Sequence, residues 1–153
     1  MHGPFESRHP LVGLIDEISR LNGRLKSTFA VARRAAGLND SEMMVLNAVV
    51  EAERPVTVPQ IGRSLGNPRQ IVQRAATALI AAGLIEPLAN PDHKRAPLLT
   101  GTAAGIALKR RADAIADEAA AGLAAGLDPA ALRAATIELR GLRRQLEDRL
   151  RRG

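Results

Sequence analysis

The sequence predicts a mainly α-helical fold with one small β-hairpin near its centre. Apolar residues recur at helical spacing over most of the chain, and residues able to cap helix N-termini precede several of these stretches. One polar turn separates two short extended segments. With 153 residues, the chain fits one domain, or one compact module with an oligomerisation appendage.

The first three helices are predicted from apolar stripes and caps. Residues 11–37 carry one continuous apolar stripe at helical spacing. Asn39 and Glu42 stand at the spacing of a capping box, and so do Thr57 and Gln60. We therefore expect a long helix followed by two shorter ones.

The fourth helix has the most sharply defined start in the chain. Asn67 is placed as its N-cap and Pro68 at its first position, and Gly83 ends it. The inward face of this helix is predicted to consist of Val72, Ala75, Ala76 and Leu79.

A hairpin and two further helices complete the element order. Residues 84–88 and 97–100 are predicted to be strands, joined by a polar, basic turn. Thr102 is placed to cap a long Ala-rich helix, and the Asp-Pro pair at 128–129 opens the last helix.

This order divides the chain into two regions. Residues 38–102 have the order of a winged helix-turn-helix, in which the β-hairpin is the wing. Residues 11–37 and 103–152 carry more apolar surface than a small winged helix needs to cover, so we expect them to be dimerisation helices. Packing of both regions on the chain's own core is the alternative. The residues expected to dimerise are Leu11, Leu14, Ile15, Ile18, Leu139, Leu142, Leu146 and Leu150.

The composition excludes several classes of protein. Aromatic residues are only 1% of the chain, which argues against RNA and single-strand binders that stack bases on aromatic rings. The chain has no Cys, which excludes disulfides, thiolate metal sites and a thiol redox switch. No apolar run reaches the length of a membrane span, and residues 1–10 lack the apolar centre of a signal peptide. We expect a cytoplasmic protein with no metal, no cofactor and no membrane association.

Positive charge is concentrated in two zones of the chain, whose net charge is +6. Residues 54–100 hold six basic and two acidic groups, and residues 129–153 hold seven and three. Only the first zone is expected to meet DNA. The second is interpreted either as an anion contact or as a solvated helix face.

The outward face of the fourth helix is predicted to read base edges in the major groove of double-stranded DNA. Arg bonds guanine and Gln bonds adenine bidentately, while Thr offers a hydroxyl and a methyl group. No acid occurs between Arg54 and Ile85, where it would repel phosphate. A solvated polar face is the alternative. The candidate DNA-binding residues here are Arg69, Gln70, Gln73, Arg74 and Thr77, with Thr57 as a further candidate.

The predicted hairpin tip holds a second group of candidates, His93, Lys94 and Arg95. A narrow minor groove attracts cations inserted into it. Asp92 is expected to pair with Arg95 or to cap the turn rather than to meet DNA. A plain solvated turn is the alternative.

Five segments carry a resemblance to a known family. They are Leu38–Leu46, Val56–Gly66, Arg69–Arg74, Ala82–Glu86 and Asn90–Leu99. Together, over about residues 11–148, the chain resembles the multiple antibiotic resistance regulator (MarR) family of bacterial winged-helix transcription factors. The resemblance implies a homodimer with interleaved first and last helices, recognition helices in successive major grooves and wings in minor grooves. The outward residues of the fourth helix match the family's DNA-reading helix, and Lys94 and Arg95 match its wing-tip cations.

The resemblance also implies a pocket for a small aromatic or anionic effector between the dimerisation helices and the winged helix. Two departures from the family pattern are visible. Gly101 follows the second strand, where it loosens the strand end, and Asn67-Pro68 replaces a small apolar residue and Ser or Thr. The arginines that could meet an anion, or else form a solvated face, are Arg20, Arg24 and Arg33.

The leading hypothesis is a sequence-specific transcriptional regulator, usually a repressor in this family, that binds a pseudo-palindromic operator as a homodimer. The alternative is a winged-helix protein–protein interaction module with an acidic partner. Residues 62–66 match the G-x-S-x-G motif of hydrolases, but a strand–turn–helix elbow is not predicted around them. We therefore expect no catalytic residue and no enzyme activity.

Overall fold

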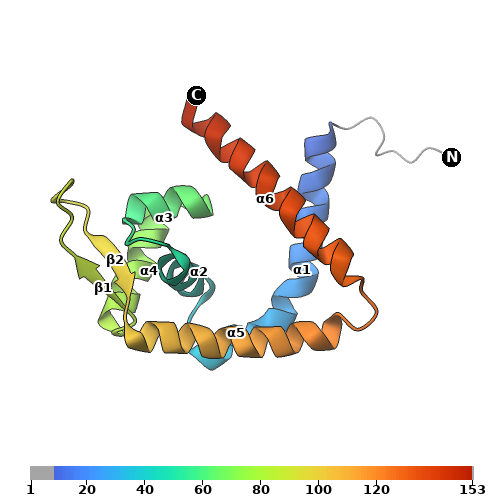
Figure 1. The fold of residues 1–153 in the computed structure, drawn as a ribbon, viewed down its shortest axis with the longest axis horizontal. Coiled ribbons are helices and arrows are strands. Elements are labelled where there is room, and N and C mark those ends of the chain that lie inside the picture. The colour runs from blue at the N-terminus through green and yellow to red at the C-terminus, as the bar shows by residue number, and fades with distance from the viewer. Residues whose placement is uncertain (1–8, 153) are drawn as a thin grey trace.

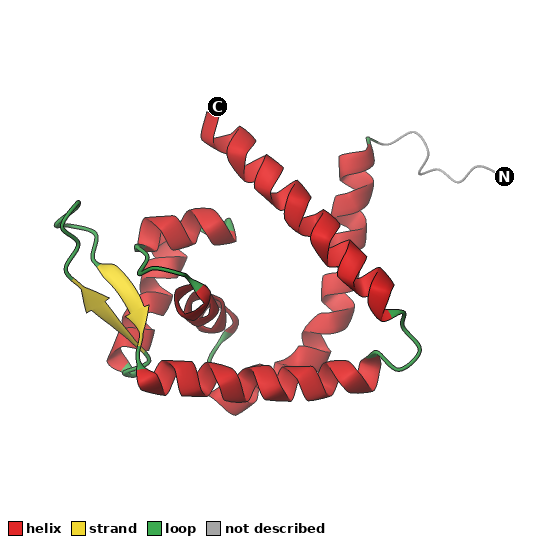
Figure 2. Cartoon of the chain, in the orientation of Figure 1, coloured by secondary structure: helices red, strands yellow, loops and turns green. Residues whose placement is uncertain are grey.

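The computed structural model describes residues 9–152 and confirms the mainly α-helical fold with one hairpin. The flanking helices α1 (Pro10–Ala36), α5 (Ala103–Leu123) and α6 (Pro129–Arg152) surround a central unit. That unit contains α2 (Asp40–Glu51), α3 (Val58–Leu65), α4 (Arg69–Ala81), β1 (Ile85–Leu88) and β2 (Leu98–Gly101). The central unit sits at one end of α5, while α1 and α6 extend from the other end (Figure 1). Figure 2 shows that the hairpin is the only sheet in the described residues.

Both predicted capping boxes are present. The Glu42 backbone N–H donates to Asn39 Oδ1 at 2.9 Å, and the Asn39 N–H donates to Glu42 Oε2 at 3.1 Å. The Gln60 N–H donates to Thr57 Oγ1 at 3.3 Å, and the Thr57 N–H donates to Gln60 Oε1 at 2.8 Å. These bonds satisfy backbone donors that an uncapped helix leaves without partners.

The predicted cap of α4 is wrong. The helix begins at Arg69, Pro68 occupies the N-cap position, and no side chain caps it. Asn67 belongs instead to the end of α3, because its N–H donates to the Gly62 carbonyl at 3.0 Å. Because Pro68 is at the N-cap, Asn67 lies one position before the cap. Its carbonyl oxygen lies close to α3, since a Cβ on Gly62 would be 3.2 Å from it.

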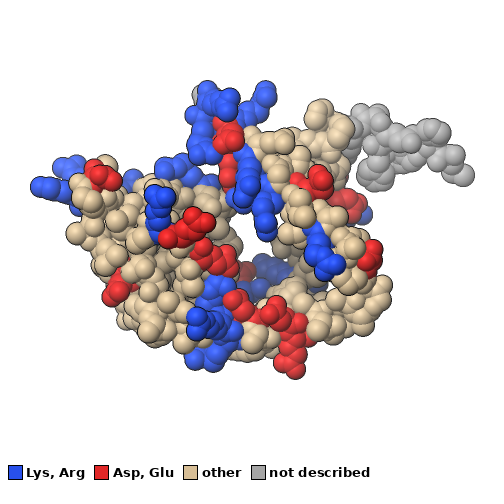
Figure 3. All heavy atoms as spheres, in the orientation of Figure 1, with Lys and Arg blue, Asp and Glu red and all other residues tan. Residues whose placement is uncertain are grey.

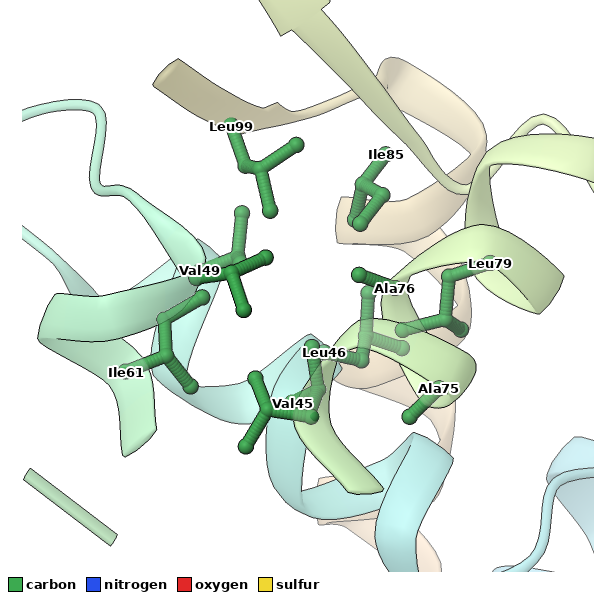
Figure 4. Packing of buried hydrophobic residues seen from close by; sticks show 11 residues of the cluster. Val45, Leu46, Val49, Ile61, Ala75, Ala76, Leu79, Ile85 and Leu99 are labelled. Atoms are coloured by element: carbon green, nitrogen blue, oxygen red, sulfur yellow. The ribbon is translucent and has the colours of Figure 1, made fainter. Parts of the chain in front are cut away.

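The core of the central unit fixes the orientation of α4. Figure 4 shows side chains from α2, α3, α4 and both strands meeting in one cluster. Leu46 of α2 and Leu79 of α4 are fully buried, and Ile61 of α3 is 2% exposed. The predicted inward face of α4 is confirmed, since all of its residues belong to this cluster. The opposite face of α4 is therefore turned to solvent.

The hairpin pairs Ile85 with Gly101 and is extended by a bridge between Val56 and Leu99. The bridge consists of hydrogen bonds of 3.1 and 2.7 Å between the two backbones. A Cβ on Gly101 would lie 3.0 Å from Val50 Cγ2. The glycine thus allows β2 to approach α2 closely, which is a packing reason for its presence.

The flanking helices bury little within one chain. Ala32 is the only buried residue of α1, and α6 has none among its described residues. Leu139 and Leu142 are each 38% exposed, and Ile15 is 53% exposed. No helix in residues 9–152 combines the length and apolar character of a membrane span.

Candidate nucleic-acid interface

The exposed face of α4 presents cations and amides together. All five candidate residues of this helix are exposed. Gln73 Nε2 donates to Thr77 Oγ1 at 3.4 Å, and that hydroxyl donates to the Gln73 carbonyl at 2.9 Å. Within residues 9–152, Arg69 and Arg74 have no acidic partner, so both guanidinium groups are free to bind an anion or a base edge.

Sequence reasoning missed Ile71 on this helix. The residue lies outside the buried stripe and is 44% exposed. It lines a shallow groove with Arg74 and the N-terminus of α2. The signal that could have identified Ile71 is an aliphatic residue that lies outside the buried stripe of the helix. Such a side chain on a DNA-reading helix can contact a thymine methyl group.

The wing presents His93, Lys94 and Arg95 as exposed residues of one turn. Asn90 organises this turn, since its Nδ2 donates to the Ala96 carbonyl at 2.8 Å and its Oδ1 accepts from the Asp92 N–H at 3.1 Å. Within residues 9–152 Asp92 forms no ion pair with Arg95, so of its two predicted roles the pairing is not present, and its role in the turn stays a prediction. An asparagine amide both donates and accepts, which lets it fix both sides of the turn.

Thr57 lies apart from the exposed candidates. It is 9% exposed, and its hydroxyl is engaged with Gln60 in the α3 cap. Thr57 is therefore the N-cap of α3, and it can affect DNA binding only indirectly, by fixing where that helix begins.

A buried lysine joins the central unit to α5. Lys109 is 8% exposed, and its Nζ lies 3.0 Å from Glu51 Oε1 at the end of α2 and 2.6 Å from Asp113 Oδ2 on α5. Burial alone lowers the pKa of Lys109, but the hydrogen bonds and charges of both carboxylates outweigh it and raise that pKa above its usual value. The sequence did not indicate this contact, which joins distant segments.

A groove of about 420 Å³ separates α1, α2 and α5. Arg33 Nε lies 2.6 Å from Asp40 Oδ1, and Lys26 Nζ lies 3.4 Å from Asp40 Oδ2. The Oδ1 atom of Asn47 is buried without a hydrogen-bond partner. Of the arginines considered from the sequence, Arg33 lines the groove and Arg20 and Arg24 do not. The other lining residues include Leu25, Phe29, Ala32, Met43, Met44, Ala112 and Ala116.

The helix order, the wing and the exposed α4 define a winged-helix transcription regulator. The family model described as MarR family matches residues 36–96. An uncharacterized protein of Mycobacterium tuberculosis (strain H37Rv) is 38% identical over 130 residues, which cover 83% of this chain and 87% of that protein. An uncharacterized protein of Mycobacterium bovis matches to the same extent. This chain belongs to the MarR family.

Solved structures show the same fold. A MarR-family regulator from Rhodococcus sp. RHA1 superimposes with a TM-score of 0.77 at 20% identity, covering 90% of this chain and 96% of that one. CouR from Rhodococcus jostii RHA1, bound to p-coumaroyl-CoA, superimposes with a TM-score of 0.72 at 20% identity, covering 86% of this chain and 91% of that one. NadR in complex with 4-hydroxyphenylacetate superimposes with a TM-score of 0.70 at 20% identity, covering 96% of this chain and 98% of that one. Members of the family are transcription regulators and not enzymes. The hydrolase-like motif here lies within α3 and its C-cap.

Proposed function

We propose that this protein is a sequence-specific repressor that binds a pseudo-palindromic operator as a homodimer and is released by a small aromatic acid. The observation that carries the proposal is the exposed face of α4, where Arg69 and Arg74 flank Gln70, Gln73 and Thr77 and neither arginine forms an ion pair within residues 9–152. A helix of this width fits the major groove of duplex DNA, and these side chains can bond base edges there.

Homodimerisation is supported by the exposed apolar residues of the flanking helices. Leu11 and Leu14 of α1 face Leu142 and Leu146 of α6 across an apolar groove of about 960 Å³. A second copy related by a two-fold axis would cover both helices. The same axis would present two α4 helices to half-sites about 10 bp, or one helical turn, apart.

Base reading by α4 and phosphate binding by the wing predict different effects of substitution. Arg69→Ala is expected to weaken operator binding by about 1–3 kcal/mol and to relax the sequence preference at one base pair. Lys94→Ala is expected to weaken binding to all duplexes alike and to lower the salt slope by about one unit. Operator fragments would be selected from a random duplex library with the wild-type protein, and affinities measured by salt-titrated gel shift. Uniform losses from both variants, or binding of the wild type only to an acidic protein, would contradict the proposal.

The effector site is proposed in the groove between α1, α2 and α5. Its apolar side chains suit an aromatic ring, and Arg33 and Lys26 suit a carboxylate that competes with Asp40. The 4-hydroxyphenylacetate in the NadR structure supports an aromatic carboxylate, and the p-coumaroyl group of the thioester in the CouR structure supports an aromatic ring. We expect 4-hydroxyphenylacetate and related carboxylates, screened by thermal shift, to stabilise the wild type. Arg33→Ala should abolish the shift. Arg34→Ala, which removes an exposed neighbour outside the groove, should keep it. An unchanged shift in Arg33→Ala would place the ligand elsewhere.

A further inference from the structure

Two basic zones that are far apart in the sequence meet in the structure. Figure 1 shows the C-terminal end of α6 reaching toward α3, and the two helices line one groove of about 510 Å³. Arg63 and Ser64 of α3 form one wall, and Leu150 and Arg151 of α6 form the other. The C-terminal arginines, interpreted above either as an anion contact or as a solvated face, thus lie beside the helix-turn-helix.

Arg63 connects this groove to the DNA-reading helix. The same residue lines a neighbouring depression with Arg69, at the start of α4. Arg69 of α4 and Arg151 of α6 thus line two neighbouring depressions that share Arg63 of α3. Arg63 is exposed, and it has no acidic partner within residues 9–152.

The arginines of α6 lie on a different face from its leucines. Arg140, Arg144 and Arg151 are spaced four and seven residues apart, which places them on one side of the helix. The stripe that includes Leu146 lies about 100° or more around the helix axis. An interface formed by the leucines leaves the arginine face uncovered. In Figure 3, basic side chains run along the upper part of α6 and recur over the adjacent central unit.

The acids near this face are already occupied. Glu147 lines the groove, and its Oε1 lies 2.7 Å from Arg143 Nη1. Asp148 Oδ1 pairs with Arg151 Nη2. Of the six arginines in residues 140–152, Arg143 and Arg151 form these two pairs, and Arg149 and Arg152 line the groove toward α1. Arg140 and Arg144 have no acidic partner within residues 9–152, so this face keeps a net positive charge. A polyanion is therefore the partner whose charge fits the surface.

We propose that Arg63 and the arginine face of α6 extend the DNA-binding surface and bind backbone phosphates of the duplex held by α4. The inference rests on the proposed DNA-binding function. Duplex DNA is favoured over an acidic protein because the positive surface is continuous with Arg69. A duplex offers a phosphate about every 3.4 Å along each strand, so the strand leaving α4 meets a row of cations.

Arg151→Ala and Arg63→Ala test this inference through the salt dependence of duplex binding. Because each substitution occurs twice in the proposed homodimer, each variant is expected to lower the slope of log K against log salt by about 1.8, for operator and random duplex alike. The double variant should lose about twice as much. Arg151→Lys, which keeps the charge, should retain most of the slope. The matched control is Arg133→Ala, because Arg133 lies on the same face of α6 but about 27 Å toward its N-terminus, at 1.5 Å per residue.

The outcomes separate this inference from the proposed function. If the wild-type protein binds no duplex, both the proposed DNA-binding function and the α6 extension are refuted. A wild type that binds, with Arg151→Ala behaving like Arg133→Ala, overturns only the α6 extension. A loss of affinity in Arg151→Ala with an unchanged slope, accompanied by a smaller species in sedimentation, also overturns it, because Arg151 then acts through the dimer. Slope losses with an intact dimer support the extension.

Discussion

Gly105 has the closest neighbour of any glycine in residues 9–152, at the point where the central unit joins α5. A Cβ built on Gly105 would lie 1.9 Å from the Leu84 carbonyl oxygen. That oxygen accepts the Thr102 N–H at 3.1 Å, and the Thr102 hydroxyl donates to the Gly83 carbonyl at 2.6 Å. An alanine at 105 therefore has to displace a backbone segment that two hydrogen bonds hold against α5.

The expected effect of Gly105→Ala follows from opposing contributions. Alanine raises helix propensity by about 1 kcal/mol relative to glycine. Overpacking against backbone costs about 1–3 kcal/mol, and a lost hydrogen bond costs about 1 kcal/mol more. We expect a net loss of roughly 2 kcal/mol, which lowers the Tm by about 4–8 °C for a chain of this size.

The assay is urea unfolding followed by circular dichroism, at one fixed protein concentration because the proposed dimer makes stability depend on concentration. Gly23→Ala is the matched control, since a Cβ at that helical position of α1 meets nothing within 4 Å. The control should gain about 0.5–1 kcal/mol. Equal stabilities for the two variants would refute the close contact at Gly105.

Two further predictions concern Lys109 and Ile71. Lys109→Met should lower the free energy of unfolding by about 1–2 kcal/mol. This loss is smaller than that for breaking a fully buried ion pair, because both carboxylate partners are more than half exposed and can hydrate. Since folding raises the pKa of Lys109, its stabilising contribution is complete below the unfolded lysine pKa of about 10.4 and is lost as pH rises through the higher folded value. Urea unfolding from pH 7 to 11 should show this alkaline loss in the wild type and not in the variant. For Ile71, the proposed insertion of α4 into the major groove predicts a contact with one thymine methyl group of the half-site. Replacing that thymine by deoxyuridine should weaken wild-type binding about four-fold, as burial of one methyl group contributes about 0.8 kcal/mol. Ile71→Ala should bind both duplexes equally, and continued discrimination by that variant would exclude the contact.

The sequence predicted the features that depend on local chemistry. Asn39 and Thr57 each form a capping box because the residues three positions later supply the reciprocal bond. The buried face of α4 follows from helical periodicity alone. Where two local signals compete for one residue, the prediction failed. Asn67 bonds through its backbone N–H to the end of α3, and α4 starts one residue later than predicted, with Pro68 at its N-cap.

The contacts between distant segments could not be predicted from one sequence. Lys109 and Glu51 are isolated charges in the sequence, and the packing of α5 on α2 brings them together. Arg63 and Arg151 belong to separate basic zones, and only the fold places them in one groove. Charge sums over the chain located both zones but gave no information on their proximity.

The exposed leucines of α6 link dimerisation to the folding of that helix. A helix of 24 residues with no buried residue is marginal by itself in water. Leu142 and Leu146 are 38% and 44% exposed, and each would occur twice in the proposed two-fold interface. Replacing both by Glu should therefore weaken dimerisation on the order of a thousand-fold or more, as burial of each leucine contributes about 1.5–3 kcal/mol.

We expect the Leu142→Glu/Leu146→Glu variant to sediment as a monomer at micromolar concentration and to lose helical circular dichroism from α6. Its affinity should fall to that of a single half-site, because two linked half-sites bind with a higher effective concentration. Ile137→Glu is the control, since Ile137 is 65% exposed and points away from the leucine stripe by helical spacing. A dimeric double variant with full helicity would show that α6 packs elsewhere. Loss of the dimer without loss of helicity would show that α6 is stable alone and that only assembly depends on its leucines.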